Sequence, residues 1–396
     1  MKLTKLSLMA ILSISSAIAG GDIAPAETTV EAPVSANTTA CNNATTINSK
    51  AQLYYYSHDD AGTSDIFKTP TSAAAGAVTF DITHKLFENV TANFSAIGYV
   101  NFGDSIGKMD FEAQPNGAFF NVANLTATFA NTTLVVGRQL LDTPLVGGFD
   151  WLLAPGSFEA ATLTNNSIDN LTLVGGYITK WRQNNSGNTW INFIDVDNGD
   201  NYTLGAAYTI GGLNISAWYY NIDAGSVVSS VEDKYSAIYA DAGYDFGIAN
   251  LSGQIISTDY HTAKDALAYG LKVSTEFSGV TFTAAVSNTT DNQAGYIGRD
   301  SIYTSSWNYF ASNAGVENDD TLSWKVGVAT EFIGLNTEVS YAAYGDEGSE
   351  LDVILGYDVT DCVNLAAIYT STDYDVNVDE QKDADNALEM IASYKF

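Results

Sequence analysis

The chain ends in A-L-E-M-I-A-S-Y-K-F, residues Ala387 to Phe396. Every second residue counted back from the end is apolar or aromatic: Phe396, Tyr394, Ala392, Met390 and Leu388. This alternation has the period of a β-strand and the length, about 9–11 residues, of a strand that crosses a membrane at a tilt. In water such a terminal strand would be an exposed edge. We therefore expect a closed membrane barrel in which the last strand pairs with the first and turns its apolar face to lipid.

The first residues predict export. Lys2 and Lys5 precede a short, mostly apolar stretch, and Ala17-Ile18-Ala19 has the small residues of a cleavage site. We interpret residues 1–19 as a secretory signal peptide, because the apolar stretch is too short to span a membrane as a helix. Together with the barrel pattern, this signal predicts the outer membrane of a Gram-negative bacterium. Lipids of that membrane, including lipopolysaccharide, are then expected partners, and Tyr394 with Phe396 is the expected signal to the barrel-assembly machinery.

Composition favours a many-stranded β protein with an acidic character. Only 16% of the residues are charged, against about 25% in globular proteins, while 23 are Tyr and 18 are Phe. Two of the 16 basic residues belong to the signal peptide and all 46 acids lie beyond it, so the expected mature chain has a net charge of −32. This charge excludes nucleic acid as a partner, because phosphate binding needs a basic face. The acids form either an ordinary solvated surface or a water-filled lumen that attracts cations.

The organisation along the chain is a short leader followed by one barrel domain. Residues 20–47 have little periodicity and read as a flexible periplasmic leader, whereas residues 48–396 hold period-two segments throughout. We expect eighteen strands, at residues 48–57, 76–86, 89–101, 118–129, 131–138, 155–164, 170–182, 201–210, 213–222, 234–246, 249–260, 267–278, 280–289, 322–332, 335–345, 350–359, 363–373 and 387–396.

The links between these strands alternate in length. Links after even-numbered strands are short, such as Gly211-Gly212 and Gly279, whereas most links after odd-numbered strands are long, such as 102–117 and 290–321. Short turns at one end and long loops at the other are typical of outer-membrane barrels. Because eighteen strands enclose more space than side chains can fill, an aqueous channel is expected.

On four of the strands, apolar residues expected to face lipid alternate with polar residues expected to face the lumen. Four charged residues of the inner set are candidates for the lumen wall: Lys272, Glu276, Lys325 and Glu338. A soluble sandwich would reverse this assignment and bury the apolar face in a core. The export signal, the loop lengths and the terminal Phe argue against the sandwich.

The third long link, residues 139–154, is rich in glycine, and an inward fold of this loop would narrow the channel. Arg138, Asp142, Asp150 and Glu159 are then candidates for a constriction with opposed charges, whose transverse field would select ions. The alternative is a surface loop with ordinary charges.

Lys180 and Arg182 share the parity of the strand residues Val174 and Ile178. Their side chains either line the pore wall opposite the acids or extend to the outer rim of the barrel. The sequence leaves both alternatives open.

Three acids, Asp195, Asp197 and Asp200, are candidates for a structural Ca²⁺ ion. They resemble the start of a calcium loop, but Ala206 stands where the bidentate acid belongs. An acidic turn is the plainer interpretation of this set. No other cofactor is expected.

Cys41 and Cys362 are the two cysteines of the chain. The expected topology places both on the periplasmic side, where a disulfide is chemically permitted. We therefore predict a bridge that ties the leader to the base of the barrel.

Catalysis finds little support in the sequence. The three histidines, His58, His84 and His261, have no recognisable nucleophile or zinc motif beside them. We therefore expect that the protein is not an enzyme.

Residues 165–173, N-N-S-I-D-N-L-T-L, together with Val136-Gly137-Arg138-Gln139 and Asp142-Thr143-Pro144, resemble the major outer-membrane porins of Campylobacter and its relatives. More distantly, the chain is similar to the porin D family, which is specific for basic amino acids and carboxylates. The closest match covers about residues 130–180. The resemblance implies an eighteen-stranded barrel, a homotrimer, cation selectivity and an inward third loop. It also implies a Ca²⁺ ion near the constriction, for which Asp142 and Asp150 are the candidate ligands. The basic residues here are too few and scattered for the arginine ladder that porin D relatives use to guide anionic groups.

We therefore predict a non-enzymatic channel through which small polar solutes and cations diffuse passively. Size exclusion and the field at the constriction would set its selectivity. The alternative is a surface adhesin or structural barrel whose loops bind partners and which has no open pore.

Overall fold

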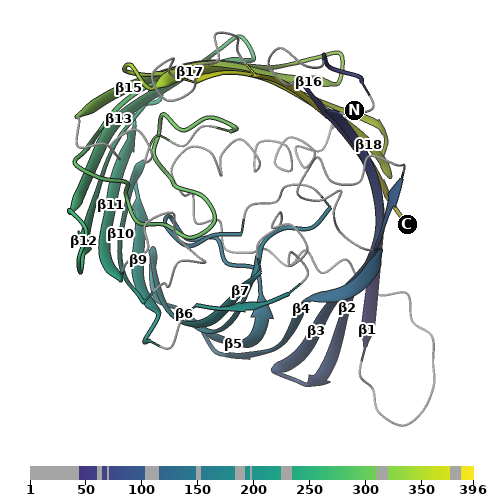
Figure 1. The fold of residues 1–396 in the computed structure, drawn as a ribbon. Helices are drawn as coiled ribbons and strands as arrows, with labels where there is room; N and C mark the ends of the chain where they lie inside the picture. The colour runs from purple at the N-terminus through teal and green to yellow at the C-terminus, as the bar shows by residue number, and fades with distance from the viewer. Residues whose placement is uncertain are drawn as a thin grey trace.

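The computed structural model describes residues 44–59, 65–68, 71–102, 116–148, 153–182, 192–196, 199–223, 234–308, 311, 320–374 and 385–396. These residues form one closed antiparallel barrel of eighteen long strands, which confirms the predicted fold class (Figure 1). A further strand of two residues, β8, pairs only with the end of β7 and does not belong to the ring.

The strands follow one another around the ring in chain order, each antiparallel to the next, and β7 pairs directly with β9. Their bounds are β1 Thr45–His58, β2 Ser72–Phe87, β3 Val90–Phe102, β4 Gly117–Phe129, β5 Thr132–Gln139, β6 Ser157–Ile168, β7 Leu171–Arg182, β8 Ile194–Asp195, β9 Tyr202–Ile210, β10 Leu213–Ile222, β11 Tyr235–Asp245, β12 Asn250–Tyr260, β13 Ala266–Phe277, β14 Val280–Thr290, β15 Thr321–Phe332, β16 Leu335–Tyr344, β17 Gly348–Thr360, β18 Val363–Tyr374 and β19 Asp385–Lys395.

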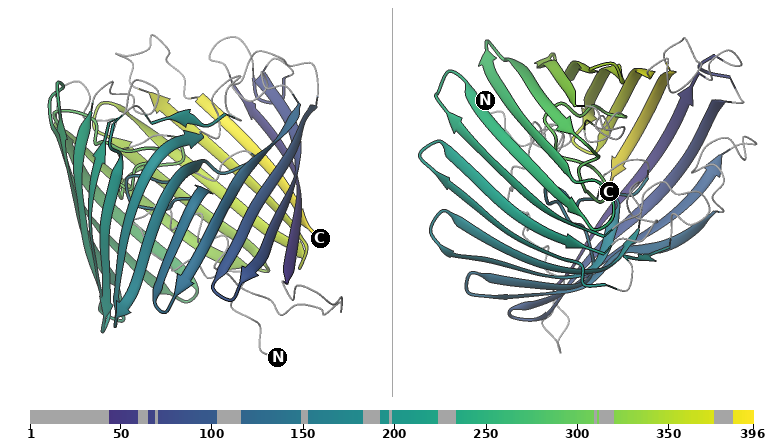
Figure 2. Two further views of the ribbon diagram at one scale, coloured as in Figure 1. Left: turned by 90° about the horizontal axis from the view of Figure 1, so that it is seen from below. Right: turned by 60° about the vertical axis from the view of Figure 1, so that its left-hand side comes forward.

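The barrel closes where the last strand meets the first. β19 pairs with β1 from Lys50 opposite Lys395 to His58 opposite Ala387, and the backbone N–H of Phe396 donates to Ser49 O at 3.0 Å. The terminal strand therefore has no free edge, as its alternation predicted. Figure 2 shows that the strands are tilted against the barrel axis, which ring closure requires.

The two ends of the barrel differ because the connections differ. Tight turns join the strands at one end; between β9 and β10 the turn is Gly211-Gly212, with φ of +57° and +85° at the two residues. Two consecutive residues in the left-handed region make the hairpin turn that matches strand twist, and glycine adopts it without steric cost. The long links all lie at the opposite end, which faces the cell exterior in outer-membrane barrels.

Side chains on each strand alternate between an outward apolar face and an inward face. On β13 the outward residues Tyr269 and Leu271 are 49% and 57% exposed, whereas the inward residues Ala266 and Ala268 are almost fully buried. The outward set of β13 is the set predicted to face lipid. Such an exposed apolar band is stable only against hydrocarbon.

β1 begins at Thr45, three residues before the expected start of the barrel domain. The additional residues pair with β2, and Thr45 Oγ1 lies 2.7 Å from His84 Nδ1. Apart from Ala44, the remainder of the expected leader lies outside the described residues, as does the expected signal peptide.

The interior contains packed residues in addition to the wall. Two clusters of buried apolar side chains combine wall strands with loop residues, one beside β10–β12 and one beside β1–β3. In the ring these two wall regions face each other. Loops therefore fold into the barrel and pack on its inner surface.

Candidate functional site

Loop 3, residues 140–156, enters the barrel from the end of β5. Its first half forms a hairpin in which Asp142 bridges to Gly147. The Thr143 hydroxyl stabilises this turn, because it donates to Val146 O at 2.6 Å and accepts from Val146 N–H at 3.2 Å. Leu145 and Val146 are at most 1% exposed. The hairpin therefore presents its tip to the inner wall and not to water.

The two described parts of loop 3 contact different sides of the barrel interior. On one side, Leu145 N–H donates to the hydroxyl of Tyr220 on β10 at 3.3 Å. On the other side, Leu153 and Ala154 are buried in the cluster that contains Tyr54 of β1. Because β10 and β1 belong to opposite parts of the ring, a loop with both contacts must obstruct part of the lumen.

The described part of loop 7 (residues 291–320) also lies inside the barrel, and sequence reasoning missed it. The green segment within the ring in Figure 1 is its described part. The hydroxyl of Tyr260 donates to Gln293 O at 2.8 Å, and Gly295 N–H donates to the hydroxyl of Thr258 at 3.0 Å. A side chain at Gly295 would collide with the ring of Tyr235. Glycine here lets the loop lie directly on the β11–β12 wall.

Loops 3 and 7 are joined by backbone hydrogen bonds. Val146 and Ile297 form a parallel bridge, in which Gly147 N–H donates to Ile297 O at 3.1 Å and Ile297 N–H donates to Leu145 O at 2.8 Å. The next residue, Gly298, has a φ of +89°, and a Cβ on it would collide with Gly147 O. The two loops therefore form one internal unit.

The far part of loop 7 covers acids on the β17–β19 wall. Glu350, Asp352 and Glu389 are each at most 3% exposed. Asp352 accepts from Trp307 N–H at 3.2 Å, and Glu350 accepts from the N–H of Asn308 at 2.8 Å. These inward carboxylates bind the loop and are not exposed to the lumen.

Basic side chains hold the same segment. Lys325 Nζ donates to Ser305 O at 2.8 Å, and Lys272 Nζ lies 4.5 Å from the ring centre of Tyr303. Arg299, within loop 7, donates to Ser306 O and, at 3.4 Å, to Trp307 O. Burial lowers the pKa of Arg299, and the charges of neighbouring acids such as Asp300 oppose this effect. The predicted lumen residues Lys272 and Lys325 do face inward, but both contact loop 7.

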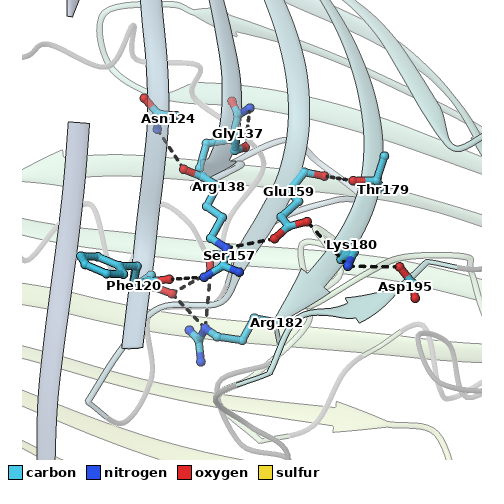
Figure 3. A network of polar contacts seen from close by, with 12 residues as sticks. Phe120, Asn124, Gly137, Arg138, Ser157, Glu159, Thr179, Lys180, Arg182 and Asp195 are labelled. Carbon is cyan, nitrogen blue, oxygen red and sulfur yellow. Dashed lines mark hydrogen bonds and ion pairs between the residues drawn. The ribbon is translucent and has the colours of Figure 1, made fainter. Parts of the chain in front are cut away.

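Four predicted constriction and calcium residues form one row across neighbouring strands (Figure 3). Arg138 Nε lies 2.9 Å from a carboxylate oxygen of Glu159, and Lys180 Nζ lies 4.0 Å from Glu159 and 3.6 Å from Asp195. Arg138 also donates to Phe120 O at 3.2 Å and lies over the ring of Phe193.

The structure places this row on the outer face of the wall, which differs from the predicted lumen position. Arg138 continues the outward alternation of Leu134 and Val136, which are 41% and 48% exposed. Glu159 pairs with Arg138 and therefore shares its face. The row lies one step beyond the apolar band at the long-loop end, where charged side chains reach the membrane surface.

A bulge explains the position of Lys180. The register between β6 and β7 shifts where Glu159 pairs with Lys180 and Ala160 pairs with Ile178, so Thr179 is the extra residue. One extra residue reverses the faces of all residues beyond it. Lys180 therefore leaves the inward face of Val174 and Ile178 and joins Glu159 outside. Of the two alternatives left open, the structure favours the outer rim.

Arg182 has a structural position that the sequence did not indicate. It is fully buried, and its Nε donates to Asn121 Oδ1 at 2.9 Å, while another nitrogen donates to Pro155 O. Ser157 also donates to Asn121, at 2.6 Å. These contacts connect β4, β6 and β7 above the end of β5. Arg182 thus fills the gap that β5 leaves when it departs as loop 3, and it does not line the pore.

Of the remaining predicted residues, two face the lumen, one lies in loop 3 and one lies outside the described part of the chain. Glu276 and Glu338 are on inward faces, since their neighbours Phe277 and Val339 are outward and exposed. Asp142 lies in loop 3, and desolvation by burial raises the pKa of its carboxyl. Asp150 lies outside the described residues.

Neither predicted calcium set can be assembled from the described part of the chain. Asp150 and Asp197 lie outside it, and Asp195 points toward Lys180. Among described residues, no group of three or more His, Cys, Asp or Glu side chains is arranged to hold a metal ion. Cys362 is exposed in the turn between β17 and β18, while Cys41 is outside the described residues, so the disulfide stays a prediction.

Comparison with known proteins identifies the family of this barrel. The family described as outer membrane porin, OprD family, matches residues 105–336, more than half of the chain. The chain belongs to the OprD family of outer membrane porins. The porin is thus a member of a family of outer-membrane channels, and the narrower likeness to Campylobacter porins is not shown.

Solved structures agree with this assignment at the level of the fold. OpdO of Pseudomonas aeruginosa is 19% identical, with 89% of this chain and 97% of that chain covered and a TM-score of 0.70. OpdK of the same species, solved with vanillate, is 16% identical with a TM-score of 0.71, and the coverage is 89% and 98%. A BenF-like porin from Pseudomonas fluorescens Pf-5 is 15% identical with the same coverage and a TM-score of 0.71.

Curated protein sequences yield no match to the porin. None of its described residues forms a helix that is long and apolar enough to cross a membrane.

Proposed function

We propose that this porin is a passive, cation-preferring diffusion channel whose width is set jointly by loops 3 and 7. The observation that carries the proposal is the pair of backbone hydrogen bonds between Ile297 of loop 7 and the Leu145–Gly147 segment of loop 3 inside the barrel. A joined pair of loops narrows an eighteen-stranded lumen and leaves a restricted path for small hydrophilic solutes. Transport requires no catalytic group or energy source.

Inward charges in the short-turn half of the barrel support the preference for cations. Inward carboxylates there are exposed or half-buried: Asp81, Asp245, Glu276, Glu331, Glu338 and Asp358. Inward lysines of the same half are Lys50, Lys85 and Lys395, all near the seam between β19 and β2. The excess of carboxylates gives this part of the lumen a negative potential, which raises the local concentration of cations.

Reversal potentials in a salt gradient across a planar bilayer test this preference. The wild type is expected to favour K⁺ over Cl⁻, and the double variant Glu331→Gln/Glu338→Gln is expected to lower that permeability ratio. The matched control, Glu159→Gln/Asp259→Asn, removes two carboxylates from outward faces and should leave the ratio unchanged. Anion preference of the wild type would refute the proposal.

The resemblance of residues 165–173 to Campylobacter-type porins adds a homotrimer and a structural Ca²⁺ ion to the proposal. Membership of the OprD family supports neither feature by itself. Native mass spectrometry in detergent, before and after removal of divalent ions with EDTA, would test both. A monomer whose mass does not change with EDTA would refute both additions and leave the channel function intact.

A further inference from the structure

Loop 7 reaches the seam at which the barrel closes. The indole Nε1–H of Trp307 donates to one carboxylate oxygen of Glu389 at 2.8 Å, and the hydroxyl of Tyr54 donates to the other at 2.7 Å. Glu389 is on β19 and Tyr54 is on β1, the last and first strands of the ring. One carboxylate therefore connects the closing seam to the loop in the lumen.

This connection is shielded from water. Tyr54, Trp307 and Glu389 are 1%, 4% and 3% exposed. A hydrogen bond to a buried carboxylate is stronger than the same bond in water, and the carboxylate is costly to leave without partners. Both oxygens of Glu389 have a donor in this arrangement, so the burial is compensated.

The backbone beside Trp307 is fixed to the same wall. Asp352 and Glu350 of β17 accept from the N–H groups of Trp307 and Asn308. Thr372 donates to the second oxygen of Glu350 at 2.8 Å, and Ser340 donates to Asp352 at 3.3 Å. Two consecutive backbone donors and one indole donor thus hold the segment at three points.

The residues on both sides of this segment are also held, because Ile297 bridges to loop 3 and Ala311 O accepts from the hydroxyl of Thr289 on β14 at 3.1 Å. With both ends held and the wall behind it, residues 299–308 can move only toward the lumen if the contacts at Trp307 are lost. The position of Trp307 therefore decides how much of the passage loop 7 occupies.

We propose that Trp307 and Glu389 are positioning residues for transport, which hold loop 7 against the β17–β19 wall and keep the passage clear. This inference rests on the proposed channel function. In this proposal each carboxylate oxygen of Glu389 has its own partner. One oxygen accepts from Tyr54 at the barrel seam, and the other accepts from Trp307 of loop 7.

The two contacts are separable by substitution. Trp307→Phe removes the indole donor and replaces the indole by a smaller ring, whereas Tyr54→Phe removes the seam donor and leaves the hydrogen bond from Trp307 to the carboxylate in place. Single-channel recordings of Trp307→Phe are expected to show frequent partial closures and at least a two-fold rise in open-channel current noise. Tyr54→Phe is the matched control and should record as the wild type does.

Substitutions of Glu389 provide a second pair in case Trp307→Phe does not fold. Glu389→Gln keeps an oxygen for the indole and should retain quiet openings, whereas Glu389→Ala loses both contacts and should close intermittently. The proposal would be overturned if folded Trp307→Phe and Glu389→Ala showed the same low current noise as the wild type. A steady, larger conductance in these variants would overturn it as well.

Hydrogen exchange in detergent micelles separates this inference from the channel function. The amides of Trp307 and Asn308 should exchange at least ten-fold faster in Trp307→Phe than in the wild type or Tyr54→Phe. If the wild type conducts no current, the channel function fails, and the exchange result still decides whether Trp307 anchors the loop. Equal exchange in all variants would overturn the anchor itself.

Discussion

Two walls of the barrel carry rows of charged side chains, and the two rows differ in the face they occupy and in what they bind. On β5–β8 the row of Arg138, Glu159, Lys180 and Asp195 faces outward, with side chains 27–77% exposed that pair with one another. On β17–β19 the acids face inward, are at most 3% exposed, and bind the backbone and indole of loop 7. Whether loop residues cover a charged row therefore decides what the row does, more than the charges themselves: a covered row binds a loop, and an exposed row pairs within itself.

The energetic weight of the two rows differs for the same reason. An exposed ion pair contributes about 0–1 kcal/mol, because water screens both charges. A buried donor that loses its acceptor costs about 1–3 kcal/mol, because no water replaces the bond. We therefore expect the stability of the barrel to depend on the β17–β19 row and to be nearly independent of the β5–β8 row.

The largest effect is expected on the covered wall. Glu350→Ala leaves the N–H of Asn308 and the hydroxyl of Thr372 without their acceptor. The free energy of unfolding should fall by about 2–4 kcal/mol, since the buried Thr372 and the part-buried N–H of Asn308 each lose a hydrogen bond and a cavity forms. Denaturant unfolding in detergent micelles, followed by tryptophan fluorescence, measures this change.

A matched variant sharpens the same experiment. Glu350→Gln has almost the same volume and keeps an oxygen for the N–H of Asn308, so it should retain most of the stability. Equal losses in Glu350→Gln and Glu350→Ala would show that the hydrogen bonds to loop 7 are not what the side chain contributes.

The smallest effect is expected on the exposed wall. Arg138→Gln removes a cation that is 35% exposed and pairs with Glu159. The free energy of unfolding should change by less than about 1 kcal/mol, and conductance and reversal potential should not change, because the side chain faces outward. A clear shift in ion selectivity in this variant would place Arg138 in the lumen and refute the outward assignment of the row.

Much of the fold could be predicted because a barrel strand has a period of two. The eighteen strands, the closing strand at Ala387–Phe396 and the faces of residues such as Tyr269 and Lys272 all follow from that alternation. The same alternation could have placed Arg138 outside, since it continues Leu134 and Val136. Its proximity to the glycine-rich loop favoured the wrong face.

The internal features could not be predicted from local patterns. The bulge at Thr179 reverses the face of Lys180. Threonine is an ordinary strand residue, so the sequence at this position does not indicate a bulge. The inward course of loop 7 depends on contacts with partners distant in the sequence, such as the bond between Trp307 and Glu389, 82 positions apart. A signal was present in Gly295 and Gly298, which lie where the loop backbone meets Tyr235 and Gly147 closely.

The union of loops 3 and 7 inside the barrel is tested most directly by a cross-link. Val146 and Ile297 form a bridge and are fully buried, so Val146→Cys/Ile297→Cys, in a chain with Cys41→Ser and Cys362→Ser, should form a disulfide when the folded porin is oxidised in lipid. Mass spectrometry of the digested protein would detect it, and single-channel conductance should equal that of the reduced protein. Absence of the cross-link in a folded barrel, or a conductance that changes clearly on reduction, would contradict a constriction built from the two loops together.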